Sequence, residues 1–165
     1  MKNKIQGGFT LVELIVVIVI LGILAAVALP KFMGLERDAR VASVKSMGGT
    51  LLSAANMAHG TCMVQNCTNN SIIVIEGQNV RFANGYPTAA TVYMLVQNME
   101  GFTMANGNAR FIKTGATTTN CWVQYVPAVL GANGVVTPPS VTYQPGAITS
   151  AQTDRTVTNS LRQQC

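Results

Sequence analysis

The stretch Gly7-Gly8-Phe9-Thr10-Leu11-Val12-Glu13 joins a short basic segment to a long apolar one, and it decides the fold of the N-terminal part of the chain. From Leu14 to Leu29 no residue is polar. A helix over residues 9–29 would be about 31 Å long, close to the thickness of the hydrocarbon core of a bilayer. We therefore expect a hydrophobic transmembrane helix at 9–29.

Glu13 is the exception in this apolar segment. A carboxylate inside a membrane helix is costly, so such a residue usually has a function. If the chain is cut between Gly8 and Phe9, the new α-amino group of Phe9 is a cation one helical turn from Glu13. The amine can then pair with Glu13 of its own chain or with Glu13 of a neighbouring copy.

The segment Gly8-Phe9-Thr10-Leu11-Val12-Glu13 resembles the start of a type IV pilin precursor, whose pattern it matches at every position. The resemblance implies that residues 1–8 are a leader and that a prepilin peptidase cuts between Gly8 and Phe9 and methylates the amine of Phe9. It also implies that Phe9 and Glu13 carry assembly, by pairing between neighbouring subunits. The precursor would wait in the inner membrane, and an assembly ATPase and a platform protein would build it into an extracellular pilus, or fimbrium, on the cell surface.

Two simpler interpretations compete for the same segment. Lys2 and Lys4 with a small-residue site at Ala26-Val27-Ala28 would suit a secretory signal peptide, but the apolar run is long for one and contains Glu13. A plain membrane anchor is the other. The distribution of Lys and Arg on the two sides of the run does not decide its orientation, so the leader-inside orientation rests on the resemblance.

Beyond the apolar run we predict an amphipathic helix at 30–59. Pro30 lacks a backbone donor and clashes with the preceding turn, which predicts a helix break between Gly22 and Pro30, as a kink or as local melting. Apolar residues then recur at helical spacing, at Val41, Val44, Gly48, Leu51, Leu52 and Ala55. One face of this helix should pack on the remaining domain, and His59 should be its C-terminal residue before Gly60.

Residues 60–165 have the composition of a small β-rich domain. The predicted strands are 71–76 and 79–83, joined by a turn at Gly77-Gln78, followed by 109–113, 121–126 and 141–143. Thr88 is the predicted cap of a short helix ending at Met99. The fold class is therefore α+β, with a long N-terminal α-helix packed on an antiparallel β-sheet head domain at 60–165.

Four cysteines, Cys62, Cys67, Cys121 and Cys165, follow the apolar run, and an even number in an exported domain indicates disulfides. Three pairings are possible. The closeness of Cys62 to Cys67 favours a local bridge, which leaves Cys121 to Cys165. A zinc site is disfavoured because the ligand spacing is absent and His59 is the only histidine.

The chain lacks the motifs of an enzyme: it has no Gly-rich phosphate loop, no His-Cys-Asp cluster and few acids, so we predict no catalytic residue, cofactor or metal.

Other single features of the head domain are weak signals of function. Asn66-Cys67-Thr68 and Asn69-Asn70-Ser71 are weak glycosylation patterns. Trp122 is predicted to pack in the core against a disulfide. The scattered Arg81, Arg110, Lys113, Arg155 and Arg162 form no nucleic-acid footprint.

Pro30-Lys31-Phe32, Asp38-Ala39-Arg40 and Gly85-Tyr86-Pro87, with Leu35, narrow the resemblance to the mannose-sensitive haemagglutinin class of type IV pilins. The function this implies is a structural subunit of a homo-oligomeric helical fibre for surface attachment, biofilm formation or motility. A pseudopilin of type II secretion shares the N-terminus and is the first alternative. A DNA-binding uptake pilus subunit is an alternative of another class.

Overall fold

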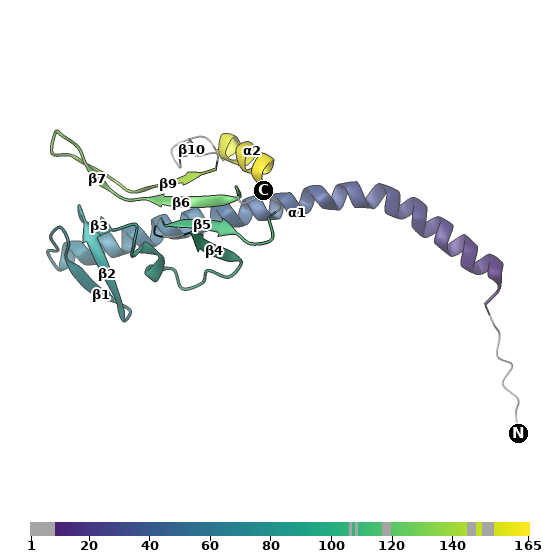
Figure 1. The fold of residues 1–165 in the computed structure, drawn as a ribbon, viewed down its shortest axis with the longest axis horizontal. Coiled ribbons are helices and arrows are strands. Elements are labelled where there is room, and N and C mark those ends of the chain that lie inside the picture. Colours follow the sequence, from purple (N-terminus) through teal and green to yellow (C-terminus); the bar gives the residue numbers. More distant parts are fainter. Residues whose placement is uncertain (1–8, 106, 108, 117–119, 145–147, 150–153) are drawn as a thin grey trace, which may run out of the picture. The chain divides into compact units, whose positions relative to one another are not determined.

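The computed structural model describes residues 9–105, 107, 109–116, 120–144, 148–149 and 154–165 (Figure 1). The chain forms two compact units, Met1–Arg37 and Asp38–Cys165. Helix α1 (Leu11–Val64) begins in the first unit and ends in the second. The fold class is α+β as predicted, with a long N-terminal helix followed by antiparallel sheets.

In the first unit α1 carries its apolar side chains on every side, and all those described up to Leu24 are exposed. The chain stays helical through Gly22 and Pro30, so the structure shows no local melting there, and the predicted kink stays a prediction. Proline removes a single backbone donor, and the good helix formers before it, Leu24, Ala25 and Ala26, maintain the surrounding turns.

In the second unit α1 buries one stripe of side chains against the head domain. The stripe recurs at helical spacing and consists of Val41, Val44, Met47, Leu51, Ala55, Ala58 and Cys62. Because this stripe is part of the core, the compact unit begins at Asp38 and not at residue 60. The helix also continues through Gly60 to Val64, so the predicted end at 59 and the role of His59 as its last residue are wrong. The contacts of the Cys62 side chain favour this extra helical turn and outweigh the tendency of Gly60 to end a helix.

Three antiparallel sheets follow the helix. The first has the order β1 (Ile72–Ile75), β2 (Gln78–Ala83) and β3 (Tyr86–Pro87). The second has the order β10 (Ile148–Thr149), β9 (Ser140–Tyr143), β6 (Trp122–Val126), β5 (Arg110–Lys113) and β4 (Phe102–Ala105). The third is a hairpin of β7 (Val129–Leu130) and β8 (Val136–Thr137), which extends past the ends of β6 and β9 in Figure 1.

Local structure differs from the prediction at two turns. The β1–β2 turn is centred on Glu76 and Gly77, with φ angles of 49° and 79°, one residue earlier than predicted. The helix predicted from Thr88 to Met99 is only a 3₁₀ turn, η1 (Val92–Leu95). The Thr88 hydroxyl is hydrogen-bonded to the Thr91 hydroxyl at 3.0 Å, and β-branched residues there disfavour a longer helix.

The main core lies between α1 and the five-stranded sheet. Phe111, Val123, Tyr125 and Val141 supply the side chains from the sheet. A smaller cluster joins Ala58 and Cys62 of α1 to Ile73, Val80 and Phe82 of the β1–β2 hairpin. The C-terminal helix α2 (Asp154–Gln164), which we did not predict, closes the main core with Val157, Leu161 and Cys165.

Candidate functional site

The residues predicted to carry assembly lie at the N-terminal end of α1. The backbone N–H and the hydroxyl of Thr10 donate to one Glu13 carboxylate oxygen at 2.9 and 2.8 Å, and the N–H of Glu13 donates back to the Thr10 hydroxyl at 3.3 Å. This is a capping box, in which a Thr and a Glu three residues later satisfy each other's backbone donors at the start of a helix. The sequence contains the signal, Thr10-Leu11-Val12-Glu13, which we did not use.

In this arrangement Thr10, and not Phe9, is the partner of Glu13. Phe9 precedes the helix and its side chain is 86% exposed. Gly8, the other half of the predicted cleavage site, lies outside the described residues. The Glu13 carboxylate therefore has a partner within the uncut chain, and an exchange of that partner for the Phe9 amine can only follow cleavage.

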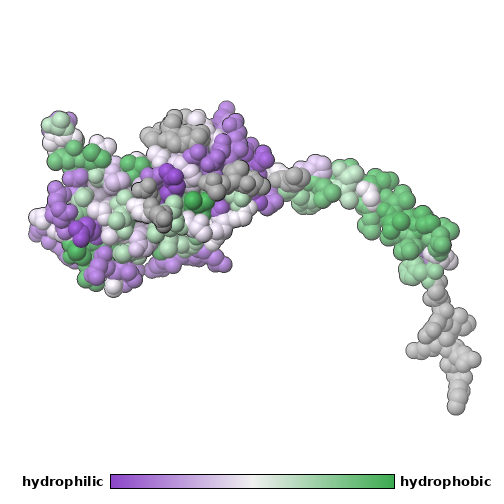
Figure 2. All heavy atoms as spheres, viewed as in Figure 1, coloured by the Kyte–Doolittle hydropathy of each residue, from purple (hydrophilic) through white to green (hydrophobic). Residues whose placement is uncertain are grey.

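Exposed apolar side chains surround Glu13 and continue along the first unit, where Figure 2 shows them as a long green surface. Among the described residues, α1 is the one helix that by length and composition could cross a membrane, and none of its most apolar window is buried in the protein. A fully apolar helix surface is stable only in lipid or against other apolar helices. The segment is therefore suited to both environments.

Two disulfides brace the second unit. Cys62 at the end of α1 is bonded to Cys67, and Cys121, just before β6, is bonded to Cys165, just after α2, with Cα–Cα distances of 5.0 and 4.7 Å. Both pairs are those that sequence proximity indicated. The second bridge links the sheet to α2, which is also held to α1 by a two-point ion pair between Arg162 and Asp38 at 2.7 and 2.9 Å.

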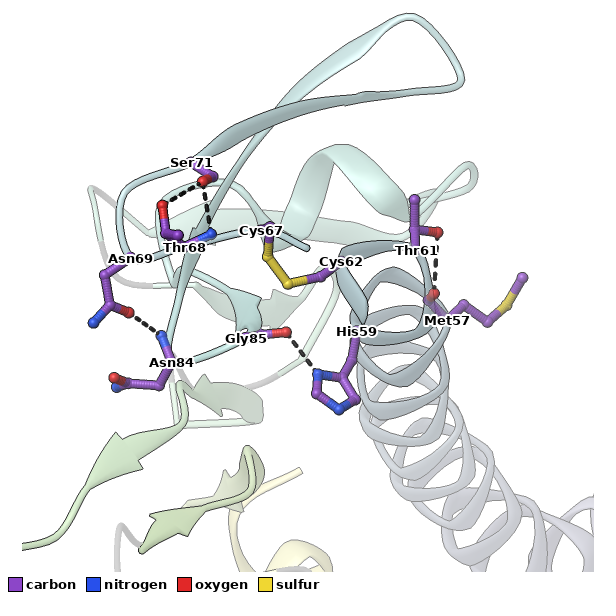
Figure 3. The surroundings of a disulfide bond; sticks show 10 residues. All are labelled: Met57, His59, Thr61, Cys62, Cys67, Thr68, Asn69, Ser71, Asn84 and Gly85. Carbon is purple, nitrogen blue, oxygen red and sulfur yellow. Dashed lines mark hydrogen bonds between the residues drawn. A yellow bond between two sulfur atoms is a disulfide. The ribbon is translucent and has the colours of Figure 1, made fainter. Parts of the chain in front are cut away.

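His59 connects α1 to the β2–β3 turn (Figure 3). Its Nδ1 is 2.7 Å from the carbonyl oxygen of Gly85, and its ring is stacked on Tyr86 with centroids 4.0 Å apart. An imidazole used in this way is a structural contact. Consistent with this, no group of three His, Cys, Asp or Glu side chains that could hold a metal occurs in the described part of the chain.

Three other residues considered as possible binding or modification sites, Trp122, Arg110 and Asn69, make structural contacts within the head domain. Trp122 is buried at the sheet with the Arg110 guanidinium 4.2 Å from its ring centroid, so that arginine is committed to a cation–π contact. In the loop with the two glycosylation patterns, the Asn69 side-chain oxygen accepts a hydrogen bond from the N–H of Asn84 at 2.6 Å. These contacts brace the head domain and bring no catalytic set together.

Comparison with known proteins identifies the N-terminal segment. The family model described as "Prokaryotic N-terminal methylation motif" matches residues 3–29. A fimbrial protein of Neisseria meningitidis serogroup A is 36% identical over 104 residues, which cover 58% of this chain and 61% of that protein. The type IV major pilin protein PilE1 of Neisseria gonorrhoeae is 38% identical over 95 residues, 53% of this chain and 44% of that protein. The N-terminus is of the prepilin type, and the chain is related to type IV pilins.

A second kind of relative shares the same N-terminal region. The type II secretion system core protein G of Pseudomonas aeruginosa is 42% identical over 57 residues, 34% of this chain and 40% of that protein. The chain thus spans less than two thirds of the length of each of these relatives. No solved structure matches the chain. The narrower resemblance to the mannose-sensitive haemagglutinin class stays a prediction.

Proposed function

We propose that this chain is a structural subunit of an extracellular type IV pilus that serves surface attachment, biofilm formation or motility. The observation that carries the proposal is that one chain combines an exposed apolar helical segment, which starts with a prepilin-type motif, with a disulfide-braced head domain. Such a helix needs lipid before assembly and other helices after it. The relatives named as pilins and fimbrial proteins support this function.

The mechanism follows from the residues at the start of α1. A prepilin peptidase removes residues 1–8 and methylates Phe9, which creates a cation beside the carboxylate of Glu13. As the subunit leaves the inner membrane for the bundle of helices in the fibre, pairing of this cation with Glu13 of a neighbour neutralises both charges in an apolar environment. An assembly ATPase and a platform protein supply the work, since this chain has no site for nucleotide chemistry among its motifs.

Intact-mass measurement of protein sheared from cells as fibres tests the proposal. We expect a chain that lacks residues 1–8 and has one additional methyl group on Phe9. A mature chain that starts near Leu29, after the small-residue site, would show that the segment is a signal peptide and would refute the proposal.

A pseudopilin of type II secretion is the second candidate, and the similarity to core protein G favours it. Deletion of the gene separates the two. A pilin deletion should abolish long surface fibres and reduce adhesion, with secreted enzymes at normal levels. A pseudopilin deletion should instead trap secreted enzymes in the periplasm and leave surface fibres unchanged.

A further inference from the structure

The β7–β8 hairpin, together with its turn, exposes apolar side chains that belong to neither core cluster of the described domain. Val129, Leu130 and Val135 are 56%, 52% and 61% exposed. Among the described strands, β7 and β8 pair only with each other, and the base of the hairpin is tied to the domain by the Asn84 side-chain amide, which donates to the carbonyl of Ala128 at 3.1 Å. Isolated two-stranded hairpins are marginally stable, so a second surface on these side chains would stabilise this one.

A groove of about 620 Å³ lies elsewhere on the same unit, between α1, the end of β1 and the end of η1. Its apolar lining includes Ala54, Ala58, Ile75 and Leu95, and hydroxyl and amide groups such as that of Ser53 complete the lining. The side-chain amide of Gln97 donates to the Glu76 carboxylate at 3.2 Å, so the acid at the edge of the groove already has a partner. No residue of the β7–β8 hairpin lines this groove.

The two surfaces carry little charge: among the described residues that line the groove, Glu76, which accepts a hydrogen bond from Gln97, is the one charged side chain. The range 114 to 153, which includes the hairpin, contains no Asp, Glu, Lys or Arg, and neither does the range 46 to 75, which supplies the α1 wall. A surface without cations does not attract nucleic acid or anionic lipid. Each of them therefore suits a protein surface that is partly apolar and carries little charge.

We propose that the β7–β8 hairpin of one copy docks in the groove between α1, β1 and η1 of the next copy. The proposal rests on the proposed function as a fibre subunit, and it names the head-domain contact of that fibre. Every copy carries one hairpin and one groove. Because these are different surfaces of the same domain, the contact between copies is head to tail. Such contacts form open helical polymers when they do not close into a ring.

Cross-linking in the intact fibre tests the contact directly. The full chain with both Ser53→Cys and Leu130→Cys, assembled on cells, sheared off and treated with a short thiol-specific cross-linker, should yield a ladder of covalent multimers. Cells that express the two single variants together should yield dimers without longer products. The matched control pairs Ser53→Cys with Met104→Cys, which is also exposed but lies on β4, and should yield no ladder.

A charge exchange tests the same contact through fibre yield. Leu130→Asp should lower the yield about tenfold, because a carboxylate without a partner opposes burial of the hairpin. Adding Ser53→Arg to that variant should restore most of the yield, and Met104→Asp should leave it unchanged. Exported protein level and disulfide mapping report whether Leu130→Asp folds, and if it does not, the cross-linking result decides.

The outcomes separate this inference from the proposed function. Abundant fibres of the Ser53→Cys/Leu130→Cys variant that give no multimer ladder, or that give links only within one chain or to another protein, would overturn the hairpin contact and leave the pilus assignment intact. Normal fibre yield from a folded Leu130→Asp variant would overturn it as well. If the wild type forms no fibres, the proposed function itself is wrong.

Discussion

Glu13 caps α1 in the structure, and in the proposed function it also pairs with the Phe9 amine. Its oxygen accepts both the backbone N–H and the hydroxyl of Thr10, which starts α1, and after cleavage the Phe9 amine would compete for the same carboxylate. The capping hydrogen bonds need only an acceptor oxygen, whereas pairing with the amine needs a negative charge. The two roles can therefore be separated by substitution.

Glu13→Val should leave membrane insertion intact or improved and abolish or slow fibre assembly, because the helix loses its one acid in the apolar segment. Glu13→Gln retains an acceptor for the cap but no charge, and we expect it to fail in assembly as well. Membrane fractionation and the yield of sheared fibres measure the two steps. If Glu13→Gln assembles as well as the wild type, Glu13 acts as a helix cap and not as a charge partner.

Gly48 shows how a single residue sets the distance between α1 and the sheet. A Cβ at this position would overlap the hydroxyl of Tyr143 on β9, whereas a Cβ at the neighbouring Gly49 would meet nothing. We expect Gly48→Ala to destabilise the domain by about 1–2 kcal/mol, since overpacking outweighs the gain in helix propensity. Gly49→Ala should stabilise it by up to about 1 kcal/mol.

Denaturant unfolding of the full chain in detergent measures both variants. The double variant Gly48→Ala/Tyr143→Phe should recover part of the lost stability, because the overlapping oxygen is removed. Equal effects of the two single alanine substitutions would show that the contact with Tyr143 does not restrict position 48.

Tyr125 lies in the core, and its hydroxyl donates to the carbonyl of Pro87 at 3.1 Å. Burial, with a smaller contribution from the charge of Tyr86, raises the pKa of the Tyr125 phenol above its usual value. The neutral form is favoured by the fold, so its contribution to stability is complete below about pH 10 and is lost as pH rises above that value.

Tyr125→Phe should cost about 1 kcal/mol at neutral pH, because the Pro87 carbonyl loses its donor. It should also lose less stability than the wild type as pH is raised, which unfolding curves across the alkaline range would measure. A parallel decline of the two proteins would show that Tyr125 does not contribute to the alkaline loss.

At the scale of elements, the spacing of apolar and β-branched residues predicted the helices and strands that short-range sequence determines. The β-branched run before Glu76 became β1, and the amphipathic spacing of Val41, Val44 and Leu51 marked the buried stripe of α1. Helix α2 was missed because its stabilising contacts are distant in sequence: Arg162 with Asp38, and Cys165 with Cys121. The helix predicted at Thr88 failed for the opposite reason, since local hydroxyl bonds there replaced helical ones.

The Cys121–Cys165 bridge should matter more than the Cys62–Cys67 bridge. The sequence separations are 44 and 5, and the chain-entropy model assigns loops of these sizes about 4 and about 2 kcal/mol. Replacing Cys121 and Cys165 together by serine should therefore lower the free energy of unfolding by the larger amount and increase proteolysis within α2. A larger loss from the Cys62/Cys67 double variant would indicate that the smaller cluster, and not α2, limits stability.

At the scale of the whole molecule, the sequence predicted the long apolar helix and its prepilin-type motif but not the surface of the head domain. The motif from Gly8 to Glu13 and the apolar run are contiguous, so their spacing can be read directly. The groove and the β7–β8 hairpin are not contiguous: the groove draws on α1, β1 and η1, and the exposure of Leu130 depends on the strands around it. Only the tertiary structure places such surfaces.

Calcium provides a test of the whole domain that distinguishes a pilin from a calcium-dependent pseudopilin. Beyond residue 60 the chain has only three acids, Glu76, Glu100 and Asp154, and Glu76 already accepts a hydrogen bond from Gln97 at the edge of the groove. Calcium needs six to eight oxygen ligands, usually with several carboxylates, and a ligand that binds only the folded state raises the melting temperature. We therefore expect millimolar calcium to leave the melting temperature of the full chain in detergent unchanged relative to a chelator control. A clear rise with calcium, together with secreted enzymes trapped in the deletion strain, would make the pseudopilin the better assignment.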